Sequence, residues 1–399
     1  MTTFFLNRLA TEPHALAFAG QSTPWPVALA DQTTDPSLDE ALRGHVAAAG
    51  RLLTPVAADL LATTGRPVDL FGFAPNPARL GAAADATASV EGVALTQLGA
   101  LLDLEHLGYS VAQAKPLAVL GHSQGVLAVH MTRAIEAAGS IEAAGKTLNE
   151  ILAVAALIGA AGTRRVRELG LNPKYGEASP MLSVKGATRE QVEALVARVN
   201  NARGPISIAV TNSDNHHVLS GYPEDLAAFA LEAEREHQHQ AKLREQKLHG
   251  GTVFNPTLEY LEVTLPFHSP LMAEAVEQTV SWAGACGFDQ DRTRALASEV
   301  LLNHVDWNAR VKALFNAADP AKLWIVDLGP GNTLGKLIGN VVQGTGIGVV
   351  EATTLSERST LSTLESEPER TQNWKAFAPR AINTPAGAKL VTKFSKLTG

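Results

Sequence analysis

The turn Gly121-His122-Ser123-Gln124-Gly125 constrains the fold most strongly, because of what stands on either side of it. The apolar run Pro116–Leu120 before it is typical of a buried strand, and the Ala- and Leu-rich pattern of Gln124–Ala138 after it predicts a helix. The two glycines relieve crowding in a sharp strand-to-helix turn, from which Ser123 projects at the carboxyl edge of a sheet. A tight structural turn with a capping serine is the alternative interpretation.

Strand and helix patterns alternate through most of the chain. Further short apolar runs predict strands at Ala15–Ala19, Ile206–Val210 and Leu323–Asp327. The Ala- and Leu-rich stretches between them predict helices at Leu38–Leu61, Ser89–Leu107 and Thr147–Leu169. This alternation indicates a mainly parallel sheet that helices cover.

A segment with a different pattern interrupts this alternation. Its elements follow the order β-α-β-β-α: Met181–Val184, Thr188–Val199, Ile206–Val210, His217–Ser220 and Pro223–Leu248. That order suggests a small ferredoxin-like subdomain, residues 181–263, inserted into a large α/β subdomain of residues 1–180 and 264–355. Residues 356–399 lack a clear apolar period, and we expect them to wrap the surface or to lead onward as a linker.

Composition excludes several classes of function. The 399 residues carry 33 basic and 40 acidic side chains, a net charge of −7, which argues against nucleic acid as the main partner. The N-terminus has no signal-peptide pattern, and no run of 18 apolar residues predicts a membrane span. The single cysteine, Cys286, can form no internal disulfide. We therefore expect a cytoplasmic protein.

A nucleophilic serine needs a base, because its hydroxyl is far from ionised at neutral pH. Among twelve histidines, His268 stands out in Leu265-Pro266-Phe267-His268-Ser269-Pro270-Leu271-Met272, where two prolines fix the backbone. The spacing alone leaves a buried structural histidine equally open. His122 adjoins Ser123, but we expect its side chain to diverge from that of the serine.

Together these motifs resemble the malonyl/acetyl-CoA:acyl-carrier-protein transacylase family. Phe18-Ala19-Gly20-Gln21-Ser22 looks like its N-terminal glycine–glutamine turn, and Asp327–Leu334 looks like its Gly-Pro-Gly block. Asn212-Ser213 and Val218–Gly221 are similar to its small-subdomain hairpin. The acetyltransferase domain of type I fatty acid synthases, fungal or single-chain bacterial, is the most similar subgroup. The resemblance implies a large subdomain like that of α/β-hydrolases, and a piece of a larger polypeptide.

The resemblance also implies the roles of residues. Ser123 would be the nucleophile and His268 its base, and the backbone N–H groups of Gln21 and Gln124 would hold the oxyanion. A backbone carbonyl near the Gly-Pro-Gly block, at Leu328 or Gly329, would orient the base.

The substrate pocket and the partners follow from the same resemblance. The positions that match the family's pocket are Ile158, His122, Asn212 and Phe267. The implied partners are acetyl-CoA, an acyl carrier protein and other domains of a fatty acid synthase, without nucleic acid or membrane. No metal and no permanently bound cofactor are implied, since the coenzyme A thioester is a substrate.

Ile158 bears on the acyl group. Malonyl-selective members carry an arginine at the matching position, where it pairs with the malonyl carboxylate. An isoleucine cannot neutralise a carboxylate, so we expect transfer of an acetyl group. In the alternative interpretation the arginine comes from Arg164 or Arg165, and malonyl is transferred.

Two other functions stay open at this point. An α/β-hydrolase, either an esterase or a thioesterase, shares the Gly-x-Ser-x-Gly turn, but its histidine usually lies near the C-terminus. A docking module with a vestigial pocket would not need the intact serine, histidine and glutamine motifs.

Overall fold

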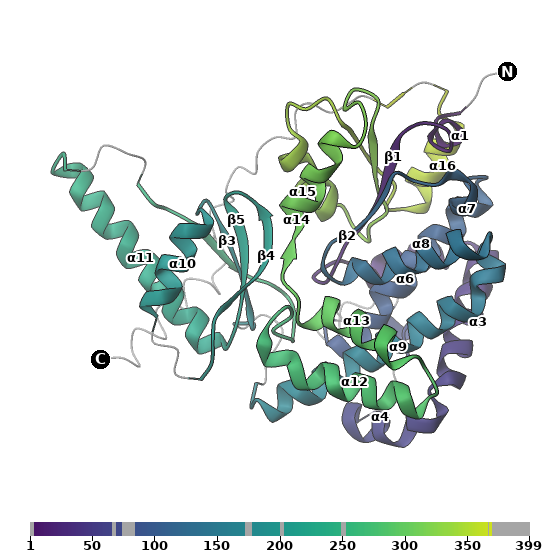
Figure 1. The fold of residues 1–399 in the computed structure, drawn as a ribbon, viewed down its shortest axis with the longest axis horizontal. Helices are drawn as coiled ribbons and strands as arrows, with labels where there is room; N and C mark the ends of the chain where they lie inside the picture. Colours follow the sequence, from purple (N-terminus) through teal and green to yellow (C-terminus); the bar gives the residue numbers. More distant parts are fainter. Residues whose placement is uncertain are drawn as a thin grey trace.

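The computed structural model describes residues 4–65, 69–73, 84–171, 178–199, 203–248, 253–365 and 367–368. Figure 1 shows two parts of unequal size, a larger one on the right and a smaller one on the left. The prediction of an α/β fold with a large subdomain and a small ferredoxin-like one is confirmed.

The large subdomain is built on a parallel sheet of order β2-β1-β8-β9. Its strands are β1 (His14–Phe18), β2 (Ala118–Gly121), β8 (Trp324–Asp327) and β9 (Gly348–Glu351). Every residue of β1 and β8 is buried, as expected for parallel strands covered on both faces. Three of the predicted strands, Ala15–Ala19, Pro116–Leu120 and Leu323–Asp327, overlap with β1, β2 and β8. Strand β9 was not predicted.

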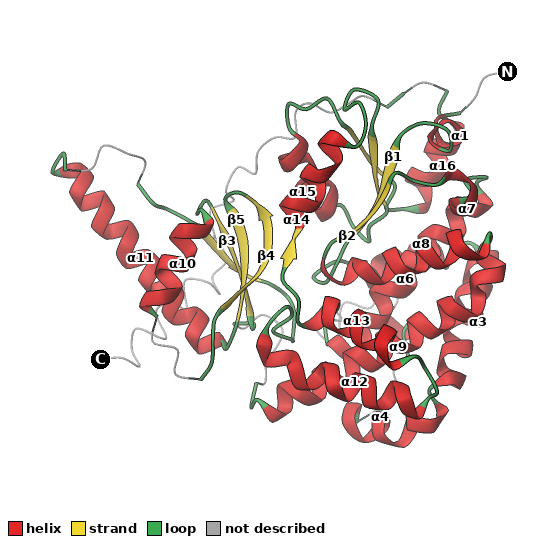
Figure 2. Cartoon of the chain, viewed as in Figure 1, coloured by secondary structure: helices red, strands yellow, loops and turns green. Residues whose placement is uncertain are grey.

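Helices enclose this sheet, as Figure 2 shows. The helices of the large subdomain are α1 (Phe5–Leu9), α2 (Trp25–Gln32), α3 (Pro36–Leu52), α4 (Ala57–Thr64), α6 (Ala86–His106), α7 (Val111–Ala114), α8 (Val126–Ala138), α9 (Ile141–Glu168), α12 (Ala273–Ala285), α13 (Gln290–Leu301), α14 (Trp307–Lys312), α15 (Thr333–Val342) and α16 (Leu355–Thr363). The predicted helix Leu38–Leu61 is in fact divided into α3 and α4, which bend by 55° around Thr54–Val56. The break lies at Pro55, because a proline lacks the N–H that would continue the helical hydrogen bonding.

Helix α9 is the central element of the helical layer. It packs against α6, α8, α3 and α12. By length and composition α9 could cross a membrane, but most of its apolar length is buried inside the structure. The close approach to α6 depends on Gly159, where a Cβ atom would lie 2.3 Å from the carbonyl oxygen of Ala86. The apolar character of α9 therefore belongs to a core helix.

The small subdomain follows the order β3 (Met181–Lys185), α10 (Arg189–Arg198), β4 (Ser207–Ser213), β5 (His216–Ser220), α11 (Pro223–Glu245) and β6 (Thr257–Tyr260). Its sheet has the order β6-β3-β5-β4, which is the ferredoxin-like arrangement, and these strands pair antiparallel. The predicted strand Ile206–Val210 lies here, in β4. Apolar runs alone do not show which sheet a strand joins, because they report burial and not pairing.

The small sheet extends beyond residue 263, where we expected it to end. Strand β7 (Val305–Asp306) pairs in parallel with Val210 and Thr211 of β4 and becomes the fifth strand. Helix α14 follows β7 directly and lies between the two sheets (Figure 1). The chain therefore contributes to the small sheet twice, and the return segment joins the two subdomains.

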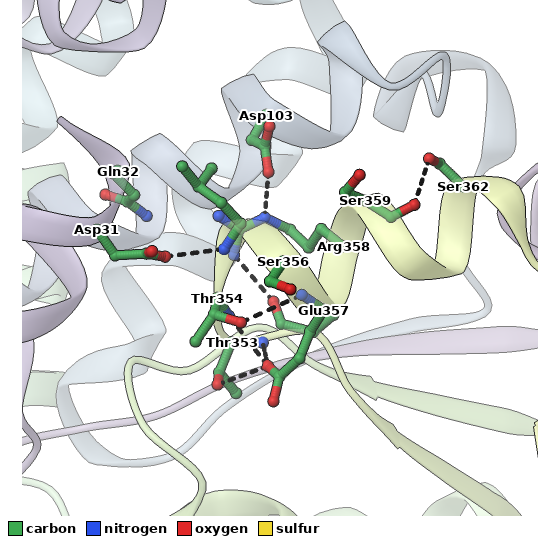
Figure 3. Close-up of polar contacts among 12 residues, drawn as sticks. Asp31, Gln32, Asp103, Thr353, Thr354, Ser356, Glu357, Arg358, Ser359 and Ser362 are labelled. Carbon is green, nitrogen blue, oxygen red and sulfur yellow. Dashed lines mark hydrogen bonds and ion pairs between the residues drawn. The ribbon is translucent and has the colours of Figure 1, made fainter. Parts of the chain in front are cut away.

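Residues after 355 begin with a helix instead of an irregular segment. Helix α16 packs against α1, and its Arg358 side chain is fully buried. The Arg358 Nε atom donates to Asp103 of α6 at 2.5 Å, and Nη1 donates to the carbonyl of Ala352 at 2.9 Å. Figure 3 shows Arg358 directed at Asp103, with Asp31 close to the start of α16. The remainder of the predicted linker, after residue 368, lies outside the described residues.

Candidate active site

Ser123 stands on a strained turn at the end of β2. It begins the 3₁₀ turn Ser123–Gly125 between β2 and α8, and its φ is +51°. A residue with a side chain pays a conformational cost in this region, and such strain is common at functional sites. Cβ atoms added at Gly121 and Gly125 would lie 2.4 Å from Val126 N and 2.3 Å from Phe18 O. Only glycine therefore fits on either side of the serine.

The structure brings Ser123 and His268 together from positions far apart in sequence. Ser123 Oγ and His268 Nε2 are 2.7 Å apart, a hydrogen bond, and the two residues are 8% and 2% exposed. His268 also has a positive φ, +57°, just before the turn Pro270–Met272. Its segment re-enters the large subdomain after the small one, as expected.

The carbonyl that contacts the other ring nitrogen of His268 belongs to Asn303. His268 Nδ1 lies 2.8 Å from this oxygen. The expectation of Leu328 or Gly329 is wrong, because Asn303 supplies this contact; the Gly329 carbonyl instead accepts from the backbone N–H of Ala19 at 2.9 Å. Asn303 follows α13, and carbonyls at a helix end lack partners within the helix.

This arrangement fixes the protonation of His268. Burial is the main cause that lowers its pKa, to about 3, so the ring is neutral at neutral pH. The Asn303 carbonyl can only accept, so Nδ1 carries the proton and donates it. The lone pair on Nε2 then faces the hydroxyl of Ser123. A neutral imidazole placed in this way can remove the serine proton during nucleophilic attack.

The turn that follows β1 lies against the serine. A Cβ atom at Gly20 would lie 2.7 Å from the His122 carbonyl oxygen and 2.8 Å from Ser123 Cβ. The next residue, Gln21, donates a side-chain hydrogen bond to Gln124. Gln124 is the second residue of the 3₁₀ turn, so its backbone N–H has no acceptor within that turn. The two predicted oxyanion residues are therefore neighbours beside Ser123.

The ring of His122 contacts the small subdomain. Its Nε2 lies 2.8 Å from Oδ1 of Asn212 on β4, and its ring meets the edge of Trp307 on α14. Burial is the main cause that lowers the pKa of His122, to about 4, so it is neutral and donates to Asn212. Of the other predicted pocket residues, Phe267 is buried beside the ring of His268.

The remaining predicted pocket residue, Ile158, is fully buried in α9, one residue before the tight contact of Gly159 with α6. Arg164 and Arg165, the alternative sources of an arginine for a malonyl carboxylate, are engaged elsewhere. Arg165 donates to the carbonyl of Leu271 at 3.0 Å and forms an ion pair with Glu274 of α12. Arg164 pairs with Glu168 at 2.9 Å.

The sequence did not reveal how α14 contacts the site. Arg310 of α14 donates from Nη1 to the carbonyl of Gly121 at 2.8 Å, directly before the serine turn. Its charge also opposes protonation of both His122 and His268. Arg310 and Asn303 belong to no recognisable motif, and only the fold places them here.

Comparison with known proteins finds relatives among the fatty acid synthases. Residues 180–260 match the family model described as the fatty acid synthase central AT domain. The chain is 28% identical to the fatty acid synthase subunit beta of Saccharomyces cerevisiae over 272 residues, which are 59% of this chain and 13% of that protein. It is also 28% identical to fatty acid synthase 2 of Mycosarcoma maydis, over 71% of this chain and 8% of that protein.

In its motifs and its fold the chain resembles the malonyl/acetyl transacylase family. Its fold is that of solved malonyl transacylases. The malonyl CoA-acyl carrier protein transacylase of Coxiella burnetii aligns with a TM-score of 0.58 and 17% identity, over 88% of this chain and 96% of that one. A malonyl-transacylase solved in complex with a polyketide acyl carrier protein aligns with a TM-score of 0.61 and 16% identity, over 88% and 98%. The chain spans only 8–16% of the length of the fatty acid synthase relatives that it matches.

Proposed function

We propose that this chain transfers an acetyl group from acetyl-CoA to the phosphopantetheine thiol of an acyl carrier protein, through an acyl-serine intermediate at Ser123. The observation that carries the proposal is the hydrogen-bonded series Ser123–His268–Asn303, which begins on a left-handed turn. The named relatives support fatty acid synthesis as the setting. We propose other fatty acid synthase domains as partners and the cytoplasm as the location.

The first half-reaction forms the acyl-enzyme. His268 Nε2 takes the hydroxyl proton as Ser123 Oγ bonds to the thioester carbonyl carbon, and the oxyanion lies against the N–H groups of Gln21 and Gln124. The C–S bond then breaks, and the imidazolium returns the proton to the coenzyme A sulfur. Burial keeps His268 neutral beforehand, so the base is ready without prior loss of a proton.

The second half-reaction repeats these steps with a new thiol. His268 takes the proton of the phosphopantetheine thiol as its sulfur attacks the acyl carbon, and the bond from that carbon to Ser123 Oγ breaks. The serine oxygen receives the proton from His268. Donor and product are both thioesters, so the overall transfer is reversible.

Acetyl selectivity rests on the isoleucine at position 158, where a malonyl carboxylate would need a cation. A buried carboxylate without a partner is costly, and an isoleucine offers none. The alternative cations are engaged elsewhere: Arg164 pairs with Glu168 of α9, and Arg165 pairs with Glu274 of α12 and donates to the carbonyl of Leu271. The solved neighbours are named malonyl transacylases, so malonyl-CoA is the necessary competitor in any test.

Intact-mass spectrometry with acetyl-CoA and malonyl-CoA in competition tests the function. We expect an acetyl adduct on the wild type and none on Ser123→Ala. His268→Ala should fold and acylate at least about a hundredfold more slowly, the usual scale of a general base. An adduct that persists in Ser123→Ala contradicts the nucleophile, and a dominant malonyl adduct contradicts the acetyl assignment. Rapid loss of the adduct to water without any thiol favours the hydrolase alternative.

A further inference from the structure

A side-chain hydrogen bond joins Gln21 and Gln124, the two residues whose backbone N–H groups hold the oxyanion in the proposed mechanism. The Gln21 amide donates to Gln124 Oε1, and the Gln124 amide donates to the carbonyl of Val90 on α6. Gln124 is 0% exposed. Its carboxamide therefore has a partner at both ends and connects three separate elements: the serine turn, the turn after β1, and α6.

A third glutamine, on α6, holds the turn that follows β1. Gln97 of α6 is fully buried, and its Nε2 donates to the carbonyl of Ala19 at 2.6 Å and to that of Gly329 at 3.4 Å. Gly20, between Ala19 and Gln21, touches the serine turn so closely that a Cβ atom would not fit. The position of the Gln21 backbone is thus set by contacts with α6 and with the serine turn itself.

We propose that the side chain of Gln124 is a positioning residue for acyl transfer, which couples the two oxyanion donors by holding Gln21 and the serine turn at a fixed separation. This inference rests on the proposed function. Through Gln124, the backbone N–H groups of Gln21 and Gln124 approach the thioester oxygen as one rigid pair. The side chain touches neither substrate nor nucleophile and acts only through the backbone.

Two physical arguments favour positioning over simple core filling. A buried carboxamide is costly unless it is hydrogen-bonded, so an apolar side chain of similar size would fill the space at less cost. Oxyanion stabilisation also depends on donor placement, since a displacement of about 1 Å can reduce a rate on the order of a hundredfold. A rigid link between the donors protects the rate against such displacement.

The test is Gln124→Met, which keeps the length of the side chain and removes both hydrogen bonds. We expect the rate of acetyl-serine formation at saturating acetyl-CoA to fall about 10- to 100-fold, with KM unchanged, because the link acts in the transition state. Gln21→Met should reduce the same rate. The double variant should be no slower than the slower single variant, since each substitution already breaks the hydrogen bond between Gln21 and Gln124.

Gln32→Met is a matched control. Gln32 is also a buried glutamine, 2% exposed, and its Nε2 donates to a carbonyl of the same helix α6, that of Thr96, at 2.8 Å. This substitution, like Gln124→Met, leaves a buried carbonyl of α6 without its glutamine donor, but it should leave the acylation rate at the wild-type value.

The outcomes separate the inference from the function. A wild-type rate in folded Gln124→Met overturns the inference, and so does an equal loss of rate in Gln32→Met, which would reflect general destabilisation. A rise in KM without a change in the maximal rate overturns it as well, because that would indicate a role in binding. A wild-type chain that acetyl-CoA does not acylate at Ser123 overturns the proposed function, and the inference with it.

Discussion

The buried, neutral state of His268 predicts a specific dependence of stability on pH. The ordinary pKa of histidine is 6.5, and burial lowers that of His268 to about 3 in the folded chain. Below pH 6.5 the unfolded chain therefore binds a proton that the folded chain does not, so the free energy of unfolding falls as the pH falls. The slope for one such group approaches about 1.4 kcal/mol per pH unit. From about pH 6.5 to about pH 4.5 the loss amounts to about 2 kcal/mol.

His268→Gln isolates this contribution. Glutamine does not titrate, whereas the other histidines whose pKa is lowered by burial, among them His122 and His216, are present in both proteins. Denaturant unfolding of wild type and variant across this pH range gives the difference in unfolding free energy at each pH. We expect the wild type to lose about 2 kcal/mol relative to the variant. Parallel stability curves would show that His268 titrates normally in the folded chain and would refute the buried-base geometry.

The rate of acylation checks the same reasoning independently. Because His268 is already neutral, the rate should show no titration step near pH 6.5. A step there would mean that His268 is solvated in the working enzyme. The measurement is a stopped-flow or quenched acylation time course on protein verified as folded at each pH.

Two further substitutions test the acyl assignment and the C-terminal packing. Ile158→Arg should raise kcat/KM for malonyl-CoA relative to acetyl-CoA by roughly ten- to hundredfold, since a charge-assisted pair is worth roughly 1.5–3 kcal/mol. An unchanged ratio in a folded variant would show that Ile158 does not line the acyl pocket. Arg358→Met should lower the unfolding free energy by about 3–5 kcal/mol, because it leaves Asp103 without its buried partner. Arg358→Met/Asp103→Leu should recover part of this loss in denaturant unfolding, and a double variant no more stable than the single one would show that the loss is not one of charge pairing.

The features that the sequence predicted well are those set by local sterics. Only glycine fits at Gly121 and Gly125, and the strand before them and the helix after them have strong apolar patterns, so the serine turn was readable from a few residues. The order of elements in the small subdomain was also predicted, because each element has its own local sequence pattern. His268 needed the family resemblance, because two flanking prolines restrict a backbone without showing what it faces.

The features that the sequence did not predict depend on pairing between distant segments. Two residues of β7 are too few for a recognisable strand pattern, and their parallel partner is nearly a hundred positions earlier, in β4. Strand β9 was also missed, although its four residues make it as long as β2 and β8. The break between α3 and α4 was different, since Pro55 was visible in the sequence but the apolar pattern continues across it.

The stretch from Asn303 to Arg310 shows why the site could not be derived from its motifs alone. Its first residue contacts the base through the Asn303 carbonyl, its middle forms β7 of the small sheet, and its last residue, Arg310, holds the carbonyl of Gly121. The same sheet carries Asn212, which bonds to His122 beside the nucleophile. A shift of the small sheet would therefore act on both Ser123 and His268. The small subdomain thus belongs to the proposed catalytic geometry, although neither Ser123 nor His268 lies in it.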